Sequence, residues 1–302
     1  MENICFLLYG HRGWIGGMVC QLLENLGIRF VRGNAKVHEM DSVRQEIQTC
    51  RPTHIFSVIG RTHGVRSDGT RSTTIDYLEE KGKLQENIRD NLYAPMVLAL
   101  LTKESDIHFT YLGTGCIFEY DENHPVGDET VGFTETDVPN FFGSSYSVTK
   151  GFTDQLFHLL DQHTLNLRIR MPIIDEMHER NFITKITSYD RICSVPNSMT
   201  VLDELLPLAI EMACQKQTGT VNLTNPGVIS HNEILELYRE IVNPDFVWKN
   251  FSIEEQNKIL ASGRSNNHLT TTQLQTLFPS VKTIRESVKD TLHRMKHKIT
   301  NS

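Results

Sequence analysis

Two short motifs have residue types and a spacing that could do chemistry together. A short apolar run at residues 4–9 is followed by three closely spaced glycines, Gly10, Gly13 and Gly16. This order predicts a buried strand that turns tightly into a helix, whose exposed N-terminal amides can hold a pyrophosphate. Tyr146 and Lys150 lie four residues apart, so on a helix they share one face, where the ammonium lowers the pKa of the phenol. Such a phenol is a usable acid near neutral pH, and together the motifs indicate a nicotinamide-dependent enzyme.

Either motif alone also has an ordinary structural interpretation. The glycines could form a plain tight turn, and the Tyr146–Lys150 pair could be a surface contact on an amphipathic helix. Their order and context favour chemistry, because the glycines follow the first predicted strand and the pair opens a helix after a later strand-like run.

Apolar runs alternate with helical patterns through the first two-thirds of the chain, which is typical of right-handed βαβ units. The strand-like runs are 4–9, 29–31, 54–59, 108–112 and 165–171. The helical patterns are 14–26, ended by Gly27, 42–50, 84–101 with a kink expected at Pro95, and 145–160. This alternation predicts an α/β fold of the Rossmann type with a doubly wound parallel sheet.

Residues 1–171 are therefore predicted to form a cofactor-binding Rossmann domain. From residue 172 to residue 302 the elements become shorter and mixed, which predicts mainly a smaller mixed α/β substrate lobe, with some segments returning to the Rossmann domain. These elements include a helix at 201–214, a strand at 221–223 and a capping box from Ser230 to Glu233. Residues 64–83 are the least ordered by pattern and are expected to be a surface insertion, with a mobile loop beside the cleft as the alternative.

Composition and charge exclude several classes of protein. The 302 residues carry a net charge of -7 and no run of Lys or Arg, which argues against nucleic-acid binding. The pattern contains neither a signal sequence nor an apolar stretch of membrane-spanning length. The six cysteines form no C-x-x-C pair and the thirteen histidines have no ligand spacing, so we expect no metal site and a reducing, cytoplasmic location.

A hydroxyl is predicted at the carboxyl edge of the sheet, where open α/β sheets bind ligands. Thr114 follows the apolar run at 108–112 and could hydrogen-bond a substrate carbonyl beside Tyr146. The alternative, about equally favoured, is a strand-end threonine that satisfies a backbone group.

Longer stretches of the chain resemble one enzyme family. They are residues 9–17, 114–120, 146–150, 170–172, 181–186, 196–200, 202–207, 225–227, 248–251 and 264–267. The sequence resembles the extended short-chain dehydrogenase/reductases that act on nucleotide sugars, and within them the plant-type UDP-4-keto-6-deoxy-glucose 3,5-epimerase/4-reductases that make UDP-L-rhamnose. The glycine and Tyr–Lys motifs are shared by the superfamily, whereas Gly-Cys-Ile-Phe-Glu-Tyr at 115–120 and Asn-Phe-Ile-Thr-Lys-Ile at 181–186 are specific to the rhamnose branch.

The resemblance assigns roles to five catalytic residues. Thr114, Tyr146 and Lys150 form the reductase triad, in which the phenol protonates the C4 oxygen, the threonine orients it and the lysine holds the nicotinamide ribose. Cys116 matches the epimerising cysteine of the related GDP-fucose synthases, and Lys185 falls where the rhamnose branch has a second acid/base residue. C3 and C5 flank the C4 ketone, so their protons are acidified, and inversion needs a base on one face and an acid on the other. Pattern alone would make Cys116 a buried small hydrophobe and Lys185 a solvated surface residue.

Cofactor and substrate contacts are implied in the same way. The expected cofactor residues are Gly10, Arg12, Gly13, Trp14, Ile15, Gly16, Arg32, Lys36, Gly60, Asn91, Tyr146 and Lys150, and the expected substrate residues are Thr62, Thr114, Asn181 and Arg264. The acidic residue of NAD-type members is missing after the second strand, where Arg32 and Lys36 stand, and Arg12 lies inside the glycine turn. These three cations suit the 2′-phosphate of NADPH, so we expect NADPH, with NADH as the alternative. Gly60 lies in Ser-Val-Ile-Gly where the family usually has Asn-Ala-Ala-Gly, which weakens the inference for this turn.

The implied reaction converts UDP-4-keto-6-deoxy-D-glucose to UDP-L-rhamnose with NADPH. A chain with one glycine turn has room for one such site, so the keto sugar is expected from a separate UDP-glucose 4,6-dehydratase. The alternatives are a 4-ketoreductase alone, the same chemistry on a dTDP or GDP sugar, and a non-catalytic NADP-binding regulatory subunit. The resemblance also implies a homodimer.

Overall fold

The structure, a computed structural model, describes residues 4–301 and divides into two compact units. Unit 1 comprises residues 4–114, 144–168 and 206–221, and unit 2 comprises residues 115–143, 169–205 and 222–301. This division differs from a single boundary at residue 171, since residues 115–143 belong to unit 2. Residues 206–221 return to unit 1, as expected for some segments of the second lobe. The assignment of one unit to the cofactor and the other to the sugar stays a prediction.

Unit 1 is built on a six-stranded sheet with the strand order β11-β7-β6-β3-β1-β2. Its strands are β1 (Cys5–Tyr9), β2 (Arg29–Arg32), β3 (His54–Ser57), β6 (His108–Thr114), β7 (Thr164–Ile169) and β11 (Gly219–Asn222). The pairs β1–β2, β1–β3 and β3–β6 are parallel. Strands β1, β3, β6 and β7 are buried along their whole length, as expected for strands covered on both faces. The predicted Rossmann-type α/β fold is confirmed.

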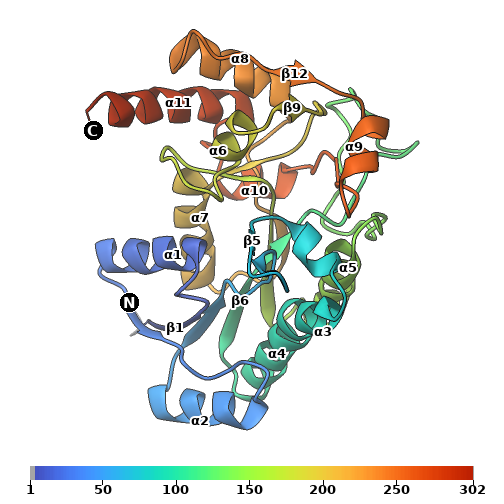
Figure 1. The fold of residues 1–302 in the computed structure, drawn as a ribbon. Coiled ribbons are helices and arrows are strands. Elements are labelled where there is room, and N and C mark those ends of the chain that lie inside the picture. The colour runs from blue at the N-terminus through green and yellow to red at the C-terminus, as the bar shows by residue number, and fades with distance from the viewer. Residues whose placement is uncertain (1–3, 302) are drawn as a thin grey trace. The chain divides into compact units, whose positions relative to one another are not determined.

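Helices cover both faces of this sheet (Figure 1). They are α1 (Trp14–Asn25), α2 (Met40–Cys50), α3 (Lys83–Ile88), α4 (Ala94–Glu104), α5 (Ser145–His158) and α7 (Leu202–Cys214), the last of which belongs to unit 1 from Leu206 onward. Val43 of α2, Leu98 of α4 and Phe157 of α5 share one apolar cluster with Ile55 and Phe109 of the sheet. Helices α1 and α7 lie on the other side (Figure 1).

At the kink predicted for Pro95, the structure has a widened helical turn just before the proline. Between α3 and α4 the chain makes one π-helical turn, η2 (Arg89–Tyr93). Pro95 has no N–H to donate to the carbonyl of Asn91 one turn earlier. The Thr153 hydroxyl of α5 donates to that carbonyl instead, at 2.6 Å. The proline therefore leaves an acceptor that ties α5 to the broken helix.

Residues 64–83 contain regular structure that their composition did not indicate. Strands β4 (Gly64–Val65) and β5 (Arg71–Ser72) form an antiparallel pair, and a short 3-10 helix, η1 (Ile75–Glu79), follows them. The hairpin turn is closed by the Arg66 N–H, which donates to the Thr70 carbonyl at 2.8 Å. The Tyr77 hydroxyl donates to Glu86 at 2.8 Å and anchors the segment to α3. The hairpin and the 3-10 helix correct the expectation that residues 64–83 are irregular.

Unit 2 has its own apolar core. Its strands and helices are β8 (Pro172–Ile173), α6 (Phe182–Thr187), β9 (Arg191–Ile192), β10 (Thr200–Val201), α8 (His231–Ile241), β12 (Lys249–Asn250), α9 (Ile253–Ile259), α10 (Thr272–Leu277) and α11 (Ile284–Thr300). The short strands pair in parallel as β8–β10 and β9–β12. Ile183 of α6, Ile234 of α8 and Leu292 of α11 meet in the core.

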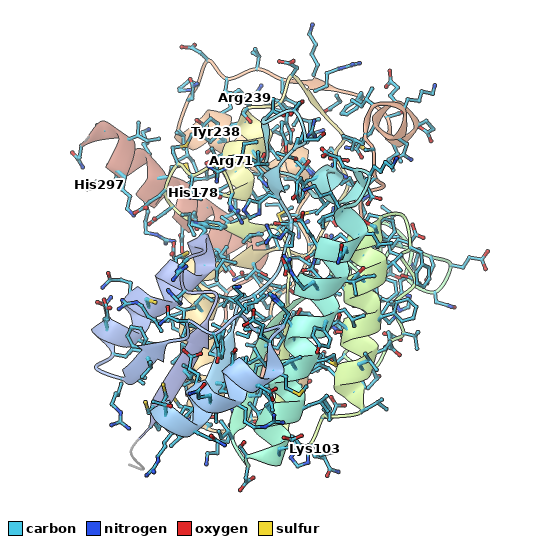
Figure 2. All side chains as sticks on the ribbon, turned by 60° about the horizontal axis from the view of Figure 1, so that its bottom comes forward. Arg71, Lys103, His178, Tyr238, Arg239 and His297 are labelled. Carbon is cyan, nitrogen blue, oxygen red and sulfur yellow. The ribbon has the colours of Figure 1, made fainter. Side chains whose placement is uncertain are left out.

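Helix α8 begins with the predicted capping box. Ser230 accepts from the Glu233 N–H at 3.2 Å, and Glu233 accepts from the Ser230 N–H at 2.8 Å. Along this helix, Tyr238 packs edge-on against Phe246, and the next residue is Arg239 (Figure 2). The start of this helix in unit 2 could therefore be predicted from its capping residues alone.

Acidification should destabilise the protein through His54 of β3. The side chain is 1% exposed, and its ring lies 5.0 Å from Phe6 and 5.5 Å from His108. Burial, and then the charges of His108 and Lys216, lower the pKa of His54 to about 4. An unfolded histidine binds protons below about pH 6.5, so stability is lost as pH falls through 6.5 toward 4, by about 2 kcal/mol at pH 5.

Urea unfolding at pH 7.5 and pH 5 measures this loss. The His54→Phe variant should lose correspondingly less stability over the same interval, whatever its starting stability. An identical pH dependence in the variant would contradict this role.

Candidate active site

The glycine turn after β1 has the shape of a pyrophosphate cradle. Gly10 has φ +87°, and a side chain there would meet Val58 at 2.8 Å. A Cβ at Gly16 would lie only 2.1 Å from the Gly10 carbonyl oxygen. Gly13 precedes α1, and among the described residues no side chain caps this helix. The turn therefore brings backbone amides and the positive end of α1 to the carboxyl edge of the sheet, which fits a dinucleotide.

Replacing Gly16 with alanine should weaken NADPH binding by roughly tenfold or more, because the new methyl group forces the turn to open. The neighbouring Gly17→Ala variant is a matched control, since a Cβ there has no atom within 4 Å. Fluorescence titration with NADPH measures both affinities. Equal affinities in the two variants would contradict a cradle built on this turn.

Three cations predicted for the 2′-phosphate lie around the end of β2. Arg12, Arg32 and Lys36 contact Asn34, Glu24 and Glu39, at 3.4, 2.9 and 3.4 Å respectively. Arg12 thus contacts a neutral amide, whereas Arg32 and Lys36 pair with carboxylates that a phosphate would have to displace. Trp14 and Ile15, also predicted to bind cofactor, are half-buried in the first turn of α1.

Asn91, on the π-helical turn, braces the segment that follows β3. Its side-chain oxygen accepts from the Arg61 N–H at 2.8 Å, and its amide donates to the Arg61 carbonyl at 2.9 Å and to Asn87 at 2.8 Å. The same oxygen lies 3.4 Å from where a Cβ of Gly60 would be. Thr62, two residues on, is half-buried with its hydroxyl 3.3 Å from a ring nitrogen of His63. Asn91 therefore positions the residues predicted to contact cofactor and substrate.

Helix α5 places Tyr146 and Lys150 on its buried face. The Ser144 hydroxyl caps the helix by accepting from the Ser147 N–H at 3.0 Å. Tyr146 and Lys150 are 8% and 4% exposed. The Lys150 ammonium donates to the hydroxyl of Tyr111 on β6. The surface-contact alternative for this pair is thus excluded.

The sequence reasoning missed Tyr111. It lies three residues before Thr114, which is 8% exposed at the end of β6. A buried ammonium needs a hydrogen-bond acceptor, so a buried Lys150 indicates that some acceptor exists. The sequence does not say which residue provides it.

In unit 2, Cys116 stands beside a buried arginine that was also missed. Arg170 is 1% exposed and donates to the Gly115 carbonyl, at 2.9 Å, immediately before the half-buried Cys116. Its other acceptors are the Ser198 carbonyl, the Asn197 side chain, and the Ser265 carbonyl and hydroxyl. Burial lowers the pKa of Arg170, and the nearby Cys116 and Tyr120 act against this lowering.

Lys185 lies on α6 within a cluster of charged residues. Burial lowers the pKa of Lys185, the charges of Arg180 and Arg264 lower it further, and Glu179 opposes them. Arg264 donates to the carbonyl and hydroxyl of Ser262, at 2.9 and 2.5 Å. An amine more easily deprotonated than a surface lysine suits acid/base chemistry.

Asn181 has a different environment from the one expected of a substrate contact. It is fully buried and caps α6, where its oxygen accepts from the Ile183 N–H at 3.2 Å. Its amide donates to the carbonyls of Ile174 and Glu176, at 2.9 and 2.7 Å. These bonds favour a role in holding α6, and thus Lys185, over contact with a ligand.

Within each unit, some of the predicted site residues lie close to one another. In unit 1, Lys150 of the predicted Tyr146–Lys150 pair contacts Tyr111, and in unit 2 Lys185 lies near Arg264. No group of three or more His, Cys, Asp or Glu side chains within residues 4–301 is arranged to hold a metal ion. No helix in that range is long and apolar enough to cross a membrane.

Comparison with known proteins identifies the family. No protein-family model matches the chain. The crystal structure of the L780 UDP-rhamnose synthase of Acanthamoeba polyphaga mimivirus is 52% identical in sequence, covers 96% of this chain and 99% of its own, and superimposes with a TM-score of 0.91. A bifunctional dTDP-4-dehydrorhamnose 3,5-epimerase/dTDP-4-dehydrorhamnose reductase of Arabidopsis thaliana is 44% identical over 94% of this chain and 90% of its own.

A more distant structure shares the fold alone. It is the dTDP-4-dehydrorhamnose reductase of Bacillus anthracis in complex with NADP, which is 16% identical, covers 98% of this chain and 99% of its own, and has a TM-score of 0.77. With a buried Tyr–Lys pair and two relatives above 40% identity over almost the whole length, the chain belongs to the family of nucleotide-sugar 3,5-epimerase/4-reductases of rhamnose synthesis.

Proposed function

We propose that this protein converts UDP-4-keto-6-deoxy-D-glucose to UDP-L-rhamnose, inverting C3 and C5 and then reducing the C4 ketone with NADPH. The observation that carries the proposal is the 52% identity to L780 UDP-rhamnose synthase across 96% of the chain. The keto sugar requires prior oxidation at C4 and loss of water at C6, so a UDP-glucose 4,6-dehydratase activity outside these 302 residues supplies it.

Reduction uses the residues of unit 1. NADPH bound at the glycine turn supplies the hydride for C4. Tyr146 donates a proton to the C4 oxygen as negative charge develops there, and Thr114 hydrogen-bonds the same oxygen. The Lys150 ammonium favours the tyrosinate that remains and holds the nicotinamide ribose. Arg12, which contacts only a neutral amide among its described hydrogen bonds, is the cation we assign to the 2′-phosphate.

Epimerisation uses the residues of unit 2. One of Cys116 and Lys185 removes the proton from the carbon beside the ketone, and the other returns a proton to the opposite face. The lowered pKa of Lys185 supports this role, because it makes the amine easier to deprotonate than a surface lysine. Arg264 is assigned to a UDP phosphate, for which a guanidinium supplies paired donors.

A product assay tests the proposal against its rivals. Purified protein is given NADPH with UDP- or dTDP-4-keto-6-deoxyglucose in D₂O, and the products are identified by NMR. UDP-L-rhamnose deuterated at C3 and C5 is expected. Product without deuterium at these carbons would show that the protein is only a 4-ketoreductase. Preference for the dTDP sugar would show that the natural substrate carries dTDP in place of UDP. Binding of both ligands without NADPH oxidation would support the alternative of a non-catalytic regulatory subunit.

Replacing Cys116 with alanine should abolish deuterium incorporation at C3 and C5 while preserving reduction of a pre-epimerised 4-keto-L-rhamnose substrate. Removing the thiol deletes one acid/base group but leaves Tyr146 and Lys150 in place. Cys214→Ala, which removes a half-buried thiol from α7, is the control. Retained exchange in Cys116→Ala would transfer the epimerase role to another residue.

We further propose a cytoplasmic homodimer. All six cysteines are free thiols, in keeping with a reducing compartment. Phe152 and Leu156 of α5 and Leu159, the C-cap residue of this helix, are 61, 38 and 78% exposed, and Leu100 of α4 is 46% exposed. A second copy of this face would cover them. Sedimentation should give a dimer for the native protein and a monomer for Phe152→Glu, and a native monomer would refute this assignment.

A further inference from the structure

Tyr111 is held in a buried position between the sheet and α5. It lies on β6 and is 2% exposed. Its ring stacks on Phe157 of α5 with a centroid distance of 4.8 Å and an interplanar angle of 5°. Such a stack fixes the ring plane, and therefore the direction in which the hydroxyl points.

The hydroxyl of Tyr111 contacts Lys150, whose side chain is long and flexible. Lys150 carries its ammonium on four methylene groups, and the ammonium donates to the Tyr111 oxygen. Burial, together with the charges of Tyr146 and Asp154, raises the pKa of Tyr111 well above its ordinary value. The phenol therefore stays neutral at physiological pH and serves as an acceptor for the ammonium, without becoming a counter-anion that would cancel its charge.

This contact limits where the lysine charge can be. An ammonium has three N–H donors, and fixing one on Tyr111 sets the directions of the other two. On α5, Lys150 follows Tyr146 by one turn, so a fixed ammonium keeps its charge beside the catalytic phenol. Loss of the Tyr111 hydroxyl would remove this constraint on the position of the ammonium.

We propose that Tyr111 is a positioning residue for reduction, which holds the Lys150 ammonium where it can favour the Tyr146 tyrosinate and bind the nicotinamide ribose. The proposal rests on the function proposed above. Tyr111 acts through Lys150 and does not itself touch the sugar. Its removal should therefore affect ketone reduction and cofactor binding, and spare the proton exchange assigned to Cys116 and Lys185.

The Tyr111→Phe variant tests this assignment, because it deletes the hydroxyl and keeps the stacked ring. We expect kcat for 4-keto reduction to fall roughly tenfold with little change in KM for the sugar. The alkaline limb of the pH–rate profile should move upward by about one unit, because a displaced cation no longer favours the tyrosinate. NADPH affinity by fluorescence titration should fall about threefold to tenfold, as for a lost hydrogen bond to a charged group.

The control is Tyr238→Phe on α8, which removes the hydroxyl of another buried tyrosine (Figure 2). It should leave kcat, the pH profile and NADPH affinity unchanged. Deuterium exchange at C3 and C5 should persist in both variants. Unchanged kcat and pH profile in Tyr111→Phe would overturn the proposal, and so would an equal loss of reduction and exchange, which indicates general damage to the fold.

The NADPH titration separates this inference from the proposed function. If the native protein binds NADPH but reduces no keto sugar, the proposed function fails. In that case, unchanged NADPH affinity in Tyr111→Phe also overturns the positioning role, whereas a selective loss of affinity supports it.

Discussion

Replacing Tyr146 with phenylalanine should lower the rate of NADPH oxidation with the keto sugar by about two to four orders of magnitude, the usual contribution of a positioned general acid. We assign protonation of the C4 oxygen to this phenol, and water is a poorer donor in a buried site. The ring is retained, and Lys150 keeps its bond to Tyr111. Stopped-flow absorbance at 340 nm measures the loss.

Deuterium exchange at C3 and C5 provides the internal control for Tyr146→Phe. This exchange should continue, because we assign it to Cys116 and Lys185 of unit 2. The Tyr189→Phe variant, which alters an exposed tyrosine, should retain both activities. Full reductase activity in Tyr146→Phe would remove this residue from the mechanism, and loss of exchange as well would indicate a structural role.

The elements that position this chemistry could be predicted where their signals are local. The strand before Gly10 and the helix after Gly13 follow from a short apolar run and closely spaced glycines, and their bounds agree within one residue. Pro95 predicted a break because a missing N–H is a property of one residue. That Thr153 fills the vacated acceptor could not be predicted, since it lies on another helix, 62 residues away along the chain.

The partners of buried polar groups depend on tertiary packing, and the sequence could not assign them. Lys150 was singled out from the motif, but its acceptor Tyr111 comes from a strand 39 residues earlier. In the sequence analysis Arg170 was only part of a matching stretch. In the structure its side chain donates five hydrogen bonds, which link four separate segments of unit 2. The resemblance implied that Asn181 contacts substrate, and its polarity alone does not distinguish a helix cap from a ligand contact.

The division into units shows the same limit. Hydrophobic periodicity places residues 206–221 in a helix and a strand, yet it does not say which sheet the strand joins. The strand β11 pairs with β7 at the edge of the six-stranded sheet and brings this segment back into unit 1. Strand neighbours are set by packing of the whole sheet, whereas strand positions are set by nearby residues.

The buried ion pair between Arg168 and α5 should make Arg168 a sensitive structural position in unit 1. Arg168 of β7 binds Asp154 of α5 through two bonds, at 2.9 and 2.6 Å, and their side chains are 0% and 5% exposed. Burial alone would raise the pKa of Asp154, but bonds from His158, Arg168 and Asn166 hold it below its ordinary value. The carboxylate is therefore charged at neutral pH, two turns from Tyr146 and one from Lys150.

Replacing Arg168 with methionine should lower the free energy of unfolding by about 3–5 kcal/mol, because it leaves a buried carboxylate without its cation. Urea unfolding followed by circular dichroism at pH 7.5 measures the change. The double variant Asp154→Leu/Arg168→Met should recover most of the loss, since two apolar side chains leave no unpaired charge. A single-variant loss below about 1 kcal/mol, the range of an exposed ion pair, would contradict this account of how α5 is anchored to the sheet.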